Sequence, residues 1–93
     1  SLSKDSNLPD FRDINIHPNP ASTFFNIRFI GKNEPTKITL YNSIGAVVKE
    51  ITNKTYNLIQ YSIKVDIESL PSGNYFVHYQ TRGISKTKKL LKY

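Results

Sequence analysis

Alternation of apolar and polar side chains is the feature that most limits what this chain can fold into. Phe25, Ile27 and Phe29 alternate with polar residues, and residues 63–67 and 75–79 repeat the pattern. A period of two places every second side chain on one face of a β-strand, whereas no stretch keeps the period of an amphipathic helix. Turn residues separate these segments at intervals of about 8–12 positions, as in all-β sandwiches. We therefore predict an immunoglobulin-like antiparallel β-sandwich of about seven strands.

The boundaries of the domain and its strands follow from the same pattern. Residues 1–12 lack alternation and are typical of a linker or N-terminal tail, so we place the domain at residues 13–93. We expect a loop at residues 31–35 and a two-residue turn at 82–83, whereas residues 53–60 fit either a short edge strand or a long crossover. The apolar positions of the expected strands are, in chain order, Ile14 and Ile16; Phe25, Ile27 and Phe29; Ile38 and Leu40; Val47, Val48 and Ile51; Ile63, Val65 and Ile67; Tyr75, Val77 and Tyr79; and those within 84–91.

A tight turn leads into the penultimate expected strand. Leu70, Gly73 and Tyr75 have the spacing of a tyrosine corner, in which a tyrosine hydroxyl returns to the upstream backbone of a β-sandwich. We expect Leu70 to close one end of the core and Gly73 to supply a positive φ. We also expect Gly45 to take the left-handed position of a hairpin turn at residues 42–45. These residues are predicted to preserve the shape of the domain.

Length and composition exclude several kinds of site. A chain of 93 residues forms one small domain that buries about 60–65% of its unfolded surface. The absence of cysteine excludes disulfides and thiolate metal sites. His17 and His78 are the only histidines and lack a metal-binding spacing, while Asp66 and Glu68 lack a third ligand. We therefore predict no catalytic residue, no cofactor and no metal.

Positive charge is concentrated at the C-terminal end of the sequence. The formal net charge is +6, and no acidic residue follows Glu68. Two interpretations stand: the lysines lie on a solvated edge strand and block unwanted sheet pairing, or they form a recognition surface. A nucleic-acid partner is not predicted, because the chain lacks the aromatic-plus-basic motifs of known binding modules. The basic residues after Glu68 are Arg82, Lys86, Lys88, Lys89 and Lys92.

Two prolines interrupt the segment that follows the first expected strand. The segment reads His17-Pro18-Asn19-Pro20-Ala21. Each proline lacks an N–H donor and restricts the residue before it to extended conformations. We therefore predict a stiff, exposed stub whose backbone is unpaired.

These features, taken in order, resemble the C-terminal sorting domains that mark cargo of the type IX (Por) secretion system in Bacteroidetes. Residues 18–21 match the Pro-Asn-Pro-Ala element that opens such domains, with His17 where tyrosine is common. Residues 40–48 match the mid-domain hairpin of the family, with Asn42 for the usual aspartate and Ala46 for the usual basic residue.

Two further motifs complete the resemblance. Residues 67–75 match the Leu-x-x-Gly-x-Tyr corner of the family, and residues 86–92 match its lysine-rich terminal strand. The resemblance thus covers about residues 14–93.

The resemblance implies a seven-stranded domain without catalytic activity that directs an upstream cargo across the outer membrane. It implies recognition in the periplasm by an outer-membrane translocon and a shuttle protein, followed by removal by a sortase-like peptidase within residues 1–12. The cargo would then be joined to anionic lipopolysaccharide at the cell surface or released. We expect residues 84–93 to dock by strand addition or charge pairing. The residues expected to carry the signal are Pro18, Asn19, Pro20, Gly45, Leu70, Gly73, Tyr75, Lys86, Lys88, Lys89 and Lys92.

The alternative is an accessory module of an extracellular enzyme, either a spacer or a carbohydrate binder. A sugar-binding face needs exposed aromatic side chains for stacking, and Tyr41, Tyr56 and Phe76 are the candidates. The chain has no tryptophan, which weakens this alternative. Self-association through an exposed edge strand is also left open.

Overall fold

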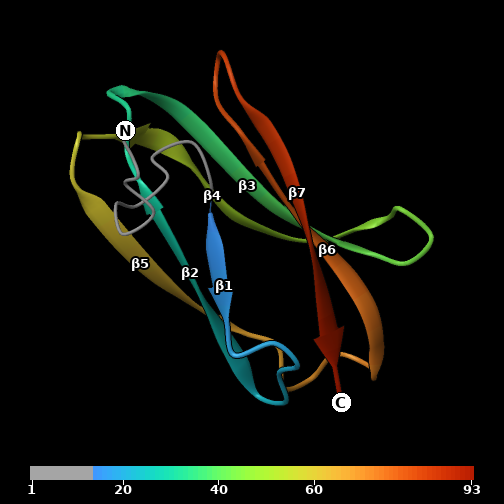
Figure 1. The fold of residues 1–93 in the computed structure, drawn as a ribbon. Helices are drawn as coiled ribbons and strands as arrows, with labels where there is room; N and C mark the ends of the chain where they lie inside the picture. The colour runs from blue at the N-terminus through green and yellow to red at the C-terminus, as the bar shows by residue number, and fades with distance from the viewer. Residues whose placement is uncertain (1–13) are drawn as a thin grey trace, which may run out of the picture.

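Seven β-strands form two antiparallel sheets in the computed structural model, which describes residues 14–93 (Figure 1). One sheet has the strand order β1-β2-β5, and the other has the order β4-β3-β6-β7. The two sheets pack against each other, so the predicted all-β sandwich is confirmed. The strands are β1 (Asn15–His17), β2 (Phe24–Ile30), β3 (Glu34–Asn42), β4 (Val47–Tyr56), β5 (Gln60–Asp66), β6 (Gly73–Gln80) and β7 (Ser85–Lys92). Within residues 14–93, no helix is long and apolar enough to cross a membrane.

The core lies between the sheets and is built from the alternating residues. Phe25 and Ile27 of β2 and Val77 of β6 are fully buried, because every second side chain of each strand points toward the other sheet. Burying a side chain of this size contributes about 1.5–3 kcal/mol to the free energy of unfolding. Phe76 and His78, which occupy the intervening positions of β6, point away from the core as predicted and are half-buried.

Four aromatic rings close one end of this core. The Phe29 ring centroid lies 5.0 Å from that of Tyr56, 5.6 Å from that of Tyr61 and 5.9 Å from that of Tyr79. Such pairs contribute about 0.5–1.5 kcal/mol each beyond the burial of their area. Tyr56 is only 5% exposed, so the expectation that it could stack on a sugar at the surface is wrong. The irregular sequence around Tyr56 contained no alternation that would have placed it in the core.

One connection differs from the sequence prediction, and another is resolved where two alternatives were left open. Glu34 and Pro35 belong to β3 rather than to a loop, and β6 pairs with β3 only from Lys37 onward. Of the described strands, only β4 therefore pairs with β3 at Pro35, and a residue without an N–H donor is tolerated at such a position. Residues 53–56 are the end of the edge strand β4, and residues 57–59 cross to the other sheet.

The predicted hairpin turn at residues 42–45 is confirmed. The Asn42 carbonyl accepts a hydrogen bond from the Gly45 N–H at 3.0 Å, and the Asn42 side-chain oxygen accepts further bonds from the N–H groups of Ile44 and Ala46. Gly45 has a φ of +86°, the left-handed conformation that glycine adopts without strain. The resulting β3–β4 hairpin projects beyond the body of the sandwich (Figure 1).

Candidate recognition surface

The predicted tyrosine corner is present at the start of β6. The Tyr75 hydroxyl donates a hydrogen bond to the Pro71 carbonyl at 2.5 Å, and Gly73 has a φ of +149°. Leu70 is half-buried and packs against the core. Tyr75 pairs with Leu90 of β7, so the corner that orients the start of β6 also orients the end of β7.

The segment between β1 and β2 is exposed at Asn19 and Pro20, as predicted, but it is not the predicted unpaired stub. The Asn19 side-chain amide donates to the Lys89 carbonyl at 2.9 Å and accepts from the Leu91 N–H at 3.0 Å. Ala21 is buried, its N–H donates to the Leu91 carbonyl at 2.8 Å, and its carbonyl accepts from the Tyr93 N–H at 2.9 Å. The prediction failed because an asparagine side chain carries a donor and an acceptor of its own, which do not depend on the neighbouring prolines.

We call this contact of Pro18–Ala21 with Lys89–Tyr93 the seam. The peptide bonds from His17 to Pro18 and from Asn19 to Pro20 are both cis. Ala21 pairs with Lys92 through a parallel bridge outside the regular strands. Because β1 and β7 belong to different sheets, the seam ties the two sheets together along one side of the sandwich. Figure 1 shows the chain leaving β1 and running toward the end of β7.

The lysines of β7 do not share one face. Lys86 and Lys88 lie opposite Tyr79 and Val77 of β6, on the side of the sheet that faces the core. Lys89 lies opposite Phe76 on the outer face and is exposed. The period of two of a β-strand separates neighbouring side chains in this way.

Lys92 differs from the other lysines of β7 because it is buried. Its side chain is 8% exposed, and its ammonium group donates to the main-chain oxygen of Tyr93 at 3.1 Å. This position makes Lys92 part of the packing at the end of β7 rather than part of an open basic surface.

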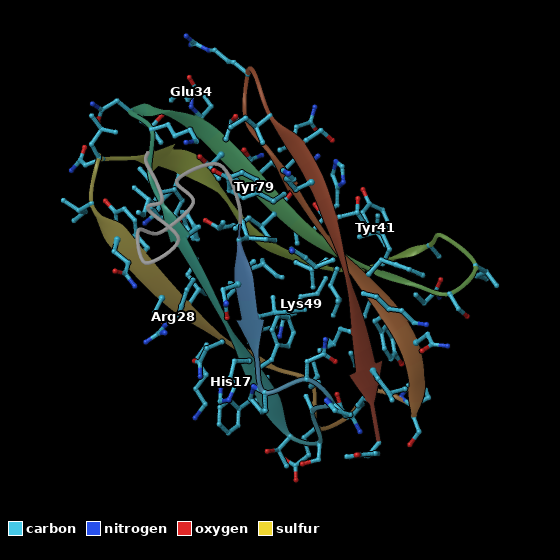
Figure 2. All side chains as sticks on the ribbon, viewed as in Figure 1. His17, Arg28, Glu34, Tyr41, Lys49 and Tyr79 are labelled. Atoms are coloured by element: carbon cyan, nitrogen blue, oxygen red, sulfur yellow. The ribbon has the colours of Figure 1, made fainter. Side chains whose placement is uncertain are left out.

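A shallow groove of about 350 Å³ lies on the outer face of the four-stranded sheet. Tyr41 of β3 and Phe76 of β6 are direct cross-strand neighbours in it, and Figure 2 shows Tyr41 near the base of the β3–β4 hairpin. Both residues were predicted to be surface aromatics, but no signal in the sequence indicates that they meet. The groove is lined by Tyr41, Asn42, Ser43, Gly45, Phe76, His78 and Thr87.

The two histidines occupy separate surroundings. His17 ends β1 (Figure 2), whereas the His78 Nδ1 atom lies 3.0 Å from the Thr87 hydroxyl on the outer face of the other sheet. Within the described part of the chain, no group of three or more His, Cys, Asp or Glu side chains is arranged to hold a metal ion. The chemistry that the surface offers is therefore hydrogen bonding, aromatic contact and positive charge.

Comparison with known proteins points to one family. The family model described as secretion system C-terminal sorting domain matches residues 15–93. The matched range contains all seven strands and therefore the seam, the tyrosine corner and the groove. No curated protein matches the chain.

Proposed function

Because the chain belongs to the family of secretion system C-terminal sorting domains and is thereby a sorting signal of the type IX secretion system, we propose that the export machinery recognises the folded seam. The parent protein of such a signal is secreted or displayed at the cell surface. The domain works by being bound, and no catalytic step of its own is proposed.

The observation that carries this proposal is the pairing of Asn19 with β7. Asn19 and Leu91 are 72 residues apart in the chain, and the hydrogen bond between them brings the first and last motifs together. Gly73 of the corner pairs with Lys92 and Tyr75 pairs with Leu90, so a third motif adjoins the same end of the molecule. Only the folded chain presents these motifs together, which makes the fold itself the signal.

We propose that the seam and the adjoining lysines of β7 are recognised through positive charge rather than through strand addition. Asn19 and Ala21 already occupy the outer edge of β7 at Lys89 and Leu91, so an added strand would have to displace them. Lys86 and Lys89 are exposed on the two faces of β7, and together with Lys88 they offer charge to an acidic partner. Buried Lys92 is left out of this docking set.

The later events are proposed from the family alone. The outer-membrane translocon and a shuttle protein would bind the domain in the periplasm. A sortase-like peptidase would then cut within residues 1–12, which lie outside the described residues. The upstream cargo would be attached to anionic lipopolysaccharide or released.

The proposal is tested by export of a fluorescent reporter. The reporter carries its own leader to the periplasm and is fused ahead of Ser1, in a bacterium with an active type IX system and in its secretion-null twin. We expect reporter outside the competent cells alone. Retention in both strains would contradict the proposal and would favour the accessory-module alternative.

A further inference from the structure

A row of side chains crosses the outer face of the four-stranded sheet from edge to edge. Tyr41 of β3 pairs with Val47 of β4 on one side and with Phe76 of β6 on the other. Phe76 in turn pairs with Lys89 of β7. Directly paired residues of antiparallel strands point to the same face, so Val47, Tyr41, Phe76 and Lys89 form a continuous row, which we call the outer row.

Packing in the core does not explain why the outer row contains apolar side chains. Its apolar members point away from the buried residues between the sheets, and Val47 is 63% exposed. Leu91, the next outer residue of β7 after Lys89, and Ile44 at the tip of the hairpin add exposed apolar surface next to the row. Of the outer row, Tyr41 and Phe76 line the groove. A contiguous exposed apolar patch on a small domain is typical of an interaction surface.

The charges on this face indicate the kind of partner. Lys89 ends the row at β7, and Asn19 holds its main-chain carbonyl, so the seam fixes the backbone position from which this positively charged side chain projects. Glu50 pairs with Thr39 and brings negative charge to the same face, but at β4, the opposite edge of the sheet from β7. With a net charge of +6, a second copy of the chain would be repelled, whereas an acidic partner is complementary.

We propose that an acidic peptide segment of the export machinery lies across the outer row, with an apolar side chain in the groove and a carboxylate at Lys89. This inference rests on the proposed function and adds the chemistry of the partner to it. Tyr41 and Phe76 present an aromatic contact surface, and His78 and Thr87 supply polar groups along the groove.

The test replaces the aromatic pair and compares it with a matched pair on the same strands. The test variant is Tyr41→Thr with Phe76→Thr, and the control variant is Lys37→Thr with Gln80→Thr. Lys37 and Gln80 are also a cross-strand pair of β3 and β6 on the outer face, at the far end of these strands from the groove. Threonine suits a strand in both cases.

Reporter export is measured for each variant, together with the melting temperature of the purified domain. We expect the test variant to lose export by about tenfold or more, as when aromatic anchors are removed from an interface. The control variant is expected to be exported like the unaltered domain. Equal export of test variant and unaltered domain would overturn the inference, as would an equal loss in both double variants.

Charge variants at Lys89 keep the test decisive if the Tyr41→Thr, Phe76→Thr variant has a lowered melting temperature. Lys89→Glu is expected to lose export to a similar extent, and Lys89→Arg is expected to retain it. Lys37→Glu, a charge reversal elsewhere on the same face, is the control. Normal export of Lys89→Glu would contradict an acidic partner.

Three further outcomes separate this inference from its rivals. If the unaltered domain sedimented as a dimer and the test variant as a monomer, a second copy would occupy the row and the inference would be overturned. The inference would also be overturned if the unaltered domain bound neutral glycans and the test variant lost this binding while its export stayed normal. Failure of the unaltered domain to export the reporter would instead contradict the proposed function itself.

Discussion

Asn19 shows how one side chain takes the place of a neighbouring strand. Its amide meets the Lys89 carbonyl and the Leu91 N–H, two groups on the outer edge of β7. An intramolecular hydrogen bond contributes about 0.5–1.5 kcal/mol net. We therefore expect Asn19→Ala to lower the free energy of unfolding by about 1–3 kcal/mol, measured by urea denaturation. Hydrogen exchange at the Leu91 amide should become faster in the same variant.

Asn74→Ala is the matched control for this change. Asn74 lies exposed on the outer face of β6, and its replacement is expected to alter the free energy of unfolding by less than about 0.5 kcal/mol. Unchanged exchange at Leu91 in Asn19→Ala would show that the seam does not protect this amide.

The Tyr75 hydroxyl is a second single group that contributes to the free energy of unfolding. Tyr75→Phe keeps the ring but removes the bond to Pro71, and we expect a loss of about 0.5–1.5 kcal/mol in the free energy of unfolding. Tyr93→Phe, at a side chain that is 68% exposed, serves as the control. Equal stability of the two variants would mean that the corner hydrogen bond contributes nothing measurable.

Tyr79 links stability to alkaline pH. Burial raises the pKa of its hydroxyl above the ordinary value of 10.0, and the nearby charge of Glu34 raises this pKa further. The unfolded chain therefore releases this proton at lower pH than the folded chain, so folding is favoured less as pH rises past the ordinary value. We expect the free energy of unfolding to fall with rising pH in that range, and to fall less steeply in Tyr79→Phe. Equal slopes in titrated urea denaturation would contradict this role.

Elements, rather than single residues, determine which side chains of β7 can be bound. Alternation along β7 sends Lys86 and Lys88 to the core side of the sheet and Lys89 to the outer face. The sequence alone predicts one docking set that contains all the lysines of the terminal strand. Pairing with β6 divides them, because each lysine takes the face of the β6 residue opposite it.

The connection between β2 and β3 packs tightly on the turn between β4 and β5. A Cβ atom added at Gly31 would lie 1.9 Å from the Asn57 carbonyl oxygen, a distance that the backbone can relieve only by moving. Gly31→Ala is expected to lower the free energy of unfolding by about 1–3 kcal/mol or more. Gly83→Ala, where the added Cβ atom would have no neighbour within 4 Å, is the control. Equal melting temperatures for the two variants would disprove the clash.

At the scale of the whole molecule, stability and recognition are separable. We expect Lys86→Ala with Lys89→Ala to reduce reporter export while the melting temperature stays within the range of the unaltered domain, because both side chains are exposed. Arg28→Ala with Lys37→Ala removes the same net charge from other exposed sites and should leave export normal. Equal export by the two double variants would show that total charge, and not its place on β7, is what matters.

The topology also explains why much of the fold was predictable. Phe25, Ile27, Val77 and Tyr79 each follow local alternation, and each is buried where that alternation placed it. Tyr56 was missed because it is buried against rings that belong to two other strands, Phe29 of β2 and Tyr61 of β5. A local pattern carries no information about such distant contacts.

The sequence by itself determined the strands, the tight turns, the tyrosine corner and the resemblance to a sorting domain, because each of these depends on residues close together in the chain. Only the tertiary structure decided that Asn19 pairs with β7, that Lys92 is buried and that Tyr41 meets Phe76. These contacts join residues 35 or more positions apart or depend on which face of a sheet is covered. Strand order and register set both, and alternation along one strand specifies neither.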